Sequence, residues 1–170
     1  GGAVTYTYDD NGNRSSQNDS TVGATAYTYD VENRLASITY PDATTSAFTY
    51  DGDGKRVNAI EGTITTRFLY DGRLHILERD AGNTTQVRYT RTLGAPGGIG
   101  GLLSQTRGST TTWYHYHGAP GNVTHLTDAT GAVVQTYSFD AFGNLLSQTG
   151  SVSNSYRFQT KEAHLKTNLV

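Results

Sequence analysis

Two short acidic segments have the residue types that a calcium ion would need. Asp9–Gly12 (Asp-Asp-Asn-Gly) and Asp51–Gly54 (Asp-Gly-Asp-Gly) offer closely spaced oxygen ligands. A calcium loop also needs a bidentate Glu at its far end, and neither segment supplies one at the right spacing. Asp also accepts backbone N–H groups two residues on, and Gly permits positive φ, so turns explain the same residues without an ion. We therefore expect turns, with calcium binding as the alternative.

Three histidines offer a second possible metal site. His115 and His117 alternate along one expected strand and so share a face, and His125 follows nearby. Two or three imidazoles with no carboxylate in register are a weak indication of zinc. Zinc therefore stays a minor alternative, and the sequence assigns no catalytic, cofactor-binding or metal-binding residue.

Other patterns that would indicate catalysis are incomplete. The glycine-rich run Gly94–Gly101 is similar to a phosphate cradle, but it lacks a Gly-Lys-Ser/Thr ending and opens no helix. We expect a hinge or a tight crossing between hairpins there, because glycine permits close backbone approach. The chain has no Gly-x-Ser-x-Gly nucleophile elbow. We therefore expect no enzymatic activity.

Arginines follow three of the expected turns, at Arg14, Arg34 and Arg56. Their guanidinium groups are suited to carboxylates of a ligand. We instead expect them to pair with turn Asp residues of adjacent repeats, as modest surface ion pairs.

The elements that position these residues form a repeat. Tyr-Asp pairs begin at Tyr8, Tyr29, Tyr50 and Tyr70, at steps of 21, 21 and 20 residues. Each pair follows an aromatic residue two positions earlier, and most precede a Gly/Asn-rich turn. A unit of about 20 residues with two turns holds two strands of ordinary length. The repeat predicts stacked β-hairpins rather than one compact core.

The aromatic positions of the repeat predict where the core lies. Residues i and i+2 of a strand share a face, so each unit contributes a two-residue stripe to one side of the sheet. In degraded form the stripe continues at Val87/Tyr89, Tyr114/Tyr116, Tyr137/Phe139 and Tyr156/Phe158. We expect the tyrosines to supply apolar area in a chain poor in aliphatic residues, with their phenols at the rim.

Composition excludes several classes of protein. The balance of 13 basic and 15 acidic residues, a net charge of -2, gives no nucleic-acid footprint. No apolar run approaches the length of a membrane span. Cysteine is absent, which excludes a disulfide framework and thiolate catalysis. The chain does not begin with Met, so we expect a processed product or a fragment.

An ordered series of segments runs along nearly the whole chain: Tyr8–Arg14, Tyr29–Leu35, Gly97–Leu103, Tyr114–Tyr116, Gly121–Thr124, Leu126–Gly131, Phe139–Asn144 and Tyr156–Phe158. This series resembles the tyrosine-aspartate (YD) repeats and the repeat-associated core of the Rhs family. The departures are His117, where the repeat would have Asp, and Thr90 after Tyr89.

The resemblance implies an all-β fold of consecutive YD-repeat β-hairpins, forming a twisted, spiralling β-sheet strip. We expect one unit over residues 1–170, with regular YD repeats at 1–93 and an Rhs-core-like segment at 94–170. Family members wall a hollow shell, in bacteria usually around a toxin encoded in the same polypeptide. Their core domains continue with a tyrosine-rich stretch and an aspartate-proline motif linked to self-cleavage, whereas this chain stops at Val170.

We therefore expect a structural protein, secreted or on the bacterial cell surface, that forms the wall of an encapsulating shell or an extracellular assembly. The alternative is a self-assembling filament or adhesive protein built by head-to-tail strand pairing, which the early stop favours because unpaired edges seek partners. An autoproteolytic toxin-delivery shell is the third hypothesis. The expected partners are further copies of the chain, or the remainder of a larger Rhs-type polypeptide with its toxin cargo. We expect no cofactor, no nucleic acid and no membrane span.

Overall fold

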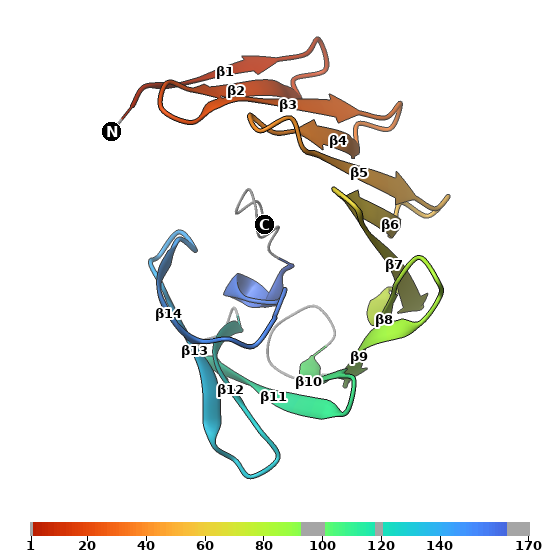
Figure 1. Ribbon diagram of the computed structural model, residues 1–170, viewed down its shortest axis with the longest axis vertical. Helices are drawn as coiled ribbons and strands as arrows, with labels where there is room; N and C mark the ends of the chain where they lie inside the picture. Colours follow the sequence, from red (N-terminus) through yellow and green to blue (C-terminus); the bar gives the residue numbers. More distant parts are fainter. Residues whose placement is uncertain (1, 93–100, 118–120, 163–170) are drawn as a thin grey trace. The chain divides into compact units, whose positions relative to one another are not determined.

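The computed structural model describes residues 2–92, 101–117 and 121–162, and it confirms an all-β protein. Fourteen strands form one sheet, in which each strand neighbours the next along the chain and β1 and β14 are the edges. Figure 1 shows consecutive strands side by side within each part of the chain. The predicted strip of consecutive hairpins is therefore confirmed. Within the described ranges, no helix is long and apolar enough to cross a membrane.

The strands and the short 3-10 helix have the following bounds: β1 Val4–Tyr8, β2 Arg14–Asp19, β3 Gly23–Tyr29, β4 Leu35–Thr39, β5 Thr45–Tyr50, β6 Arg56–Glu61, β7 Ile64–Asp71, β8 Leu74–Arg79, β9 Thr85–Arg91, β10 Leu102–Arg107, β11 Thr110–His117, β12 Asn122–Thr127, β13 Val133–Phe139, β14 Leu145–Gly150 and η1 Phe158–Thr160.

The chain divides into two compact units. Unit 1 comprises Gly1–Leu69 and Glu78–Thr84, and unit 2 comprises Tyr70–Leu77 and Thr85–Val170. Two of the boundaries along the chain therefore fall within β7 and β8.

The turns that begin at Asp9, Asp30 and Asp51 share one backbone geometry. At the first turn the amide of Asp9 donates to the carbonyl of Asn13 (2.8 Å), and the amide of Gly12 donates to the carbonyl of Asp9 (3.0 Å). Gly12 has a φ of +83°. A type I turn followed by a left-handed residue is the common three-residue hairpin loop. Both bonds recur in the turns that begin at Asp30, Tyr40, Asp51, Asp80, Asp128 and Asp140.

A β-bulge follows each of the regular YD turns. Tyr8 faces Arg14 across the hairpin, whereas Thr7 faces Ser16, so Ser15 is an extra residue on the leaving strand. The register shifts in the same way beside Tyr29, Tyr50 and Phe139. Because a bulge increases the local right-handed twist, its recurrence adds twist to these four hairpins in the same way.

The predicted aromatic stripe is the buried face of the sheet in both units. In unit 1, Tyr27, Phe48 and Phe68 are at most 9% exposed. In unit 2 the buried cluster consists of Val87, Tyr89, Leu102, Tyr114, Val123, Leu126, Tyr137 and Tyr156.

The first repeat departs from this pattern. Tyr6 and Tyr8 are 48% and 62% exposed, so the prediction that they belong to the core is wrong. The reason is that β1 has a neighbour on one side only, which leaves its rings without a preceding hairpin.

The opposite face of the sheet carries hydroxyl groups in cross-strand pairs. Thr28 lies 2.7 Å from Ser37 across one hairpin, and Ser138 lies 2.7 Å from Ser147 across another. Such pairs stabilise neighbouring strands without apolar area. This division into an aromatic face and a hydroxyl face explains how the sheet forms with few aliphatic residues.

Candidate functional site

The YD tyrosines join each hairpin to the one before it. The hydroxyl of Tyr29 donates to the carbonyl of Arg14 (3.0 Å), and the hydroxyl of Tyr50 donates to the carbonyl of Leu35 (2.8 Å). In unit 2 the hydroxyl of Tyr116 donates to the carbonyl of Leu102. Each acceptor is the first residue of the strand that precedes the tyrosine's own strand, namely β2, β4 or β10. Each of these tyrosines thus packs its ring in the sheet and donates its phenol hydroxyl to a backbone carbonyl.

Guanidinium groups lie over the aromatic rings of neighbouring repeats. The Cζ atom of Arg14 is 4.7 Å from the centroid of Tyr27, and that of Arg34 is 4.8 Å from the centroid of Tyr50. Arg56 lies between two phenylalanines, 4.4 Å from the centroid of Phe68 and 5.6 Å from that of Phe48. These distances are within cation–π range. The arginines therefore act by stacking between repeats.

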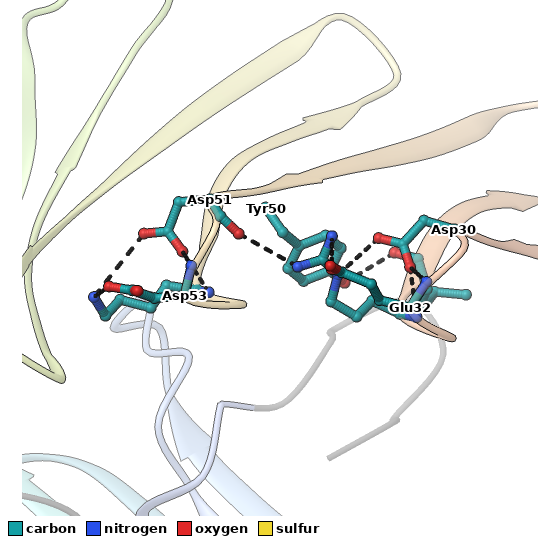
Figure 2. A network of polar contacts seen from close by, with 8 residues as sticks. Asp30, Glu32, Tyr50, Asp51 and Asp53 are labelled. Carbon is teal, nitrogen blue, oxygen red and sulfur yellow. Dashed lines mark hydrogen bonds and ion pairs between the residues drawn. The ribbon is translucent and has the colours of Figure 1, made fainter.

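Arg34 also makes ion pairs, although not the pairs that we predicted (Figure 2). Its Nε donates to Asp30 of its own turn (2.7 Å), and its Nη2 lies 2.5 Å from Glu32. Its contact with the following turn is a hydrogen bond from Nη1 to the carbonyl of Asp51 (3.3 Å). The prediction that Arg34 pairs with the carboxylate of an Asp in an adjacent repeat is therefore wrong. The guanidinium reaches the next turn at a backbone oxygen because the Asp51 side chain is held within its own loop.

The turn carboxylates are occupied by backbone amides. One oxygen of Asp51 accepts the amides of Asp53 (3.0 Å) and Lys55 (2.9 Å), and one oxygen of Asp9 accepts those of Asn11 (3.0 Å) and Asn13 (2.7 Å). This confirms the predicted turns at both segments. Asp30, Asp128 and Asp140 accept the equivalent pair of amides.

Side-chain hydrogen bonds lower the pKa of several turn carboxyls. The amide of Asn13 lowers the pKa of Asp9, the hydroxyl of Thr130 lowers that of Asp128, and the amide of Asn144 lowers that of Asp140. These groups are ionised at neutral pH, and the N–H and O–H groups that donate to them stabilise the ionised form.

Successive turns are also linked to one another in unit 1. The amide groups of Asn11 and Asn13 both donate to the side-chain oxygen of Asn33, at 3.0 and 2.9 Å. Together with the bond from Arg34 to Asp51, this connects the first three YD turns in series.

In the described part of the chain, the histidines that we considered for zinc form no group of three or more metal ligands. His115 and His125 stack in parallel, with ring centroids 4.3 Å apart and an interplanar angle of 5°. Their nitrogens lie beside the hydroxyls of Thr127 (2.9 Å) and Thr124 (3.1 Å). Burial, and then the neighbouring His115, lowers the pKa of His125. In the ranges that the structure covers, no three or more His, Cys, Asp or Glu residues are grouped as metal ligands.

Unit 2 contains a polar network that the sequence did not indicate. After β14 the chain runs across the aromatic face as residues 151–162, which we call the strap. Asn154 of the strap is 2% exposed, and its side-chain oxygen lies 2.7 Å from the Tyr114 hydroxyl. Its amide donates to the hydroxyl of Tyr137 (3.3 Å) and to the carbonyl of Tyr156 (2.6 Å). Burial raises the pKa of Tyr114, so its phenol stays protonated and available as a donor.

A buried histidine anchors the next part of the strap. His75 is 7% exposed, and its Nε2 lies 3.0 Å from the carbonyl of Leu77, which can only accept. This assigns the proton to Nε2, so Nδ1 accepts the hydroxyl of Tyr156 at 2.7 Å. No pattern in the sequence pointed to His75 or Asn154, because each acts through a partner far away in the chain. The predicted hinge in the glycine run lies largely at residues 93–100, outside the described ranges.

Comparison with known proteins agrees with the repeat geometry. The RHS Repeat family matches residues 8–45, which contain the first two YD turns. Over 110 residues, or 62% of the chain, the sequence is 34% identical to the tRNA3(Ser)-specific nuclease WapA of Bacillus spizizenii. The chain spans only 4% of the length of that relative.

Two crystal structures share the fold. The structure of TcdB2-TccC3 without its hypervariable C-terminal region matches 94% of the chain with a TM-score of 0.58 and 14% identity. The structure of TcdB2-TccC3 matches the same share with a TM-score of 0.58 and 15% identity. The chain covers 11% of each of these much longer chains. Taken together, the repeat, the sequence relative and the shared fold support an Rhs/YD-repeat protein.

Proposed function

We propose that the chain is a wall segment of an encapsulating shell, built as part of a larger Rhs-type polypeptide that carries a toxin, and that it has no catalysis of its own. The observation that carries this proposal is that Tyr29, Tyr50 and Arg34 each donate a hydrogen bond to the backbone of a neighbouring hairpin. The turn Asp carboxylates bind backbone, and the arginines cover rings. The much greater length of its relatives supports a place within a longer polypeptide. We further propose that this shell acts outside the bacterial cell or at its surface.

Electron microscopy of the full parent polypeptide tests the shell. We expect closed hollow particles, and we expect the particles to be lost when tyrosines of two repeats, Tyr29 and Tyr50, are both changed to Ala. Solid or extended particles from the unchanged polypeptide would contradict the proposal.

Absence of catalysis is tested separately on the purified chain. We expect a single intact mass after days of incubation at several pH values. A discrete pair of fragments that disappears when one Asp is substituted would show self-cleavage and would support the autoproteolytic shell instead.

The second candidate is a filament built by head-to-tail strand pairing. The observation that favours it is that every residue of β1 and of β14 is exposed, and that each of these strands has one neighbour in the described sheet. Light scattering and electron microscopy of the purified chain over a range of concentrations distinguish the two candidates. Filaments that lengthen with concentration, and that a Thr5→Lys change in β1 suppresses, would favour the filament, because edge lysines oppose strand addition.

A further inference from the structure

The aromatic face of unit 2 bonds to both the backbone and particular side chains of the strap. Gln105 and Arg107 both donate to the carbonyl of Ser153, at 3.0 and 3.1 Å. The amide of Val123 donates to the carbonyl of Arg157 (3.1 Å). Asn154 and Tyr156 are bonded to the face through their side chains. The strap is thus held by isolated backbone bonds together with bonds to particular side chains, unlike a strand held by a continuous backbone ladder.

Asn154 is recognised as an amide. Its oxygen lies 2.7 Å from the Tyr114 hydroxyl and accepts the backbone amide of Tyr156 at 3.0 Å. The donors on its nitrogen serve the Tyr137 hydroxyl and a strap carbonyl. A carboxylate in this place would lose both donated bonds, and an apolar side chain would lose all four. The Tyr114 hydroxyl keeps a second acceptor, Oε1 of Gln105 at 3.0 Å, whereas the loss of the other bonds removes partners from buried backbone groups of the strap.

Two residues that follow Asn154 in the strap, Tyr156 and Arg157, also have specific partners on the aromatic face. Tyr156 is 6% exposed, with its hydroxyl on His75 and its ring edge-to-face with Tyr89, at 5.1 Å between centroids and 84° between planes. The Cζ atom of Arg157 lies 5.4 Å from the centroid of Tyr137. Asn154, Tyr156 and Arg157 therefore each have a defined partner on the face, and this leaves Ser155 as the position whose residue type the pattern does not specify.

A single glycine joins the strap to the sheet. Gly150, the last residue of β14, has a φ of +85°, and an added Cβ would clash with the carbonyl of Val134. This glycine lets the chain leave the exposed edge strand. The strap is consequently connected to the sheet at one defined point and is otherwise held by its contacts with the aromatic face.

We propose that the aromatic face of unit 2 is a binding site for an extended peptide with the pattern Asn-x-Tyr-Arg, occupied in cis by the strap and able to take the same peptide in trans when the strap is displaced. The occupant is defined by the bonds already present: an amide between two tyrosine hydroxyls, a phenol on a histidine, and a guanidinium over a tyrosine ring. This inference is independent of the shell proposal, since it concerns unit 2 alone.

The test uses the full chain and a fluorescein-labelled peptide of residues 151–162. The host is a chain with Asn154→Ala and Tyr156→Ala, in which the strap is weakened, and its fold is checked by circular dichroism. We expect the peptide to bind this host at least 10-fold more tightly than it binds the unchanged chain or the matched control Asn144→Ala. A peptide with Asn154→Asp should bind the host at least 10-fold more weakly. A folded host that ignores the peptide, or binds both peptides equally, overturns the proposal.

A second measurement applies if the double variant does not fold. Hydrogen exchange of the unchanged chain reports whether the strap opens by itself, through the amides of Val152 and Tyr156, which are bonded to Gln135 and Asn154. The proposal expects these amides to exchange at least 10-fold faster than the amides of β11 and β13. Exchange of strap and strands in one common step would overturn it.

Discussion

The two units cover the same kind of aromatic stripe by different means. In unit 1, residues of the repeats themselves lie over the rings, as Arg14 does on Tyr27 and Arg56 on Phe68. In unit 2 a separate segment, the strap, lies across several strands and inserts Asn154 and Tyr156 among the rings. The covering of the rings in unit 1 is local, because residues of successive repeats provide it. The covering in unit 2 depends on one segment, so we expect its loss to affect all of unit 2 together.

The largest effect is expected from the YD tyrosines of unit 1. Tyr29→Ala and Tyr50→Ala should each lower the free energy of unfolding by about 3 kcal/mol, because each removes a half-buried ring and a bond to the preceding hairpin. Arg34→Ala should cost less than either change, since its ion pairs are partly exposed to solvent and such pairs contribute little to stability. The measurement is thermal or denaturant unfolding followed by circular dichroism. Tyr8→Ala is the matched control, because that ring is 62% exposed; an arginine effect larger than both tyrosine effects would refute the tyrosine-core description.

In unit 2 the corresponding test is Asn154→Ala. We expect a loss of about 2 kcal/mol, because the tyrosine hydroxyls and strap backbone groups that it bonds stay buried. Trp113 is the only tryptophan of the chain and lies on β11, so its fluorescence follows the unfolding of unit 2. Asn144→Ala, which removes an exposed turn amide of the same unit, should have a much smaller effect. Equal effects of the two substitutions would mean that the strap is not an important part of unit 2.

A smaller effect is expected from replacing a stacked guanidinium by an ammonium. Arg14→Lys keeps the charge but loses the planar contact with Tyr27, and should cost about 0.5 to 1 kcal/mol in the free energy of unfolding. The exposed Arg67, changed to Lys, serves as the control and should be nearly neutral. If both changes are neutral, charge alone accounts for Arg14, and the local covering of unit 1 depends on the tyrosines.

The smallest effect is a pH dependence confined to unit 2. The folded pKa of His125 lies below its ordinary value of 6.5, so the unfolded chain binds protons more readily than the folded one. The contribution of His125 is complete above about pH 6.5 and falls as the pH drops through 6.5 toward the lowered pKa. Trp113 fluorescence during unfolding at pH 7.5 and 5.5 should show this loss, and His125→Gln should reduce it. The exposed His117 is the control, and an equal reduction by His117→Gln would contradict the assignment.

The sequence predicted the parts of the fold that depend on near neighbours. The Tyr-Asp spacing, the turn residues and the alternation of aromatic residues are all local, and they led to the hairpins at Asp9 and Asp51 and to the buried rings at Tyr27 and Tyr114. Exposure of Tyr6 was missed because the pattern of β1 equals that of later repeats, whereas burial depends on a neighbouring hairpin. The partner of Arg34 was missed for a related reason: a guanidinium next to several Asp residues gives no indication of which one the backbone already holds.

Periodicity placed Tyr156 in the aromatic stripe, and it is buried there, but periodicity did not predict that residues 151–162 cross the aromatic face as the strap. Residues 151–157 are mostly small and polar, a composition typical of a loop, and only the folded sheet brings Tyr114 and Tyr137 to Asn154. His75 was overlooked for the same reason, since its partner Tyr156 is 81 residues away.

This difference in chain separation has a consequence for folding during synthesis. The side-chain bonds that Tyr29, Tyr50, Arg34 and Asn11 make between hairpins of unit 1 join residues 15 to 22 positions apart, so a hairpin finds its neighbour soon after leaving the ribosome. The bond between His75 and Tyr156 joins residues 81 positions apart, so it forms only after Tyr156 has been synthesised. Closing so long a loop is slower and entropically more costly than closing the short loops of unit 1. We therefore expect unit 1 to order progressively while unit 2 keeps its aromatic face uncovered until the strap is made. During that interval the nascent chain is most exposed to aggregation and most in need of chaperones.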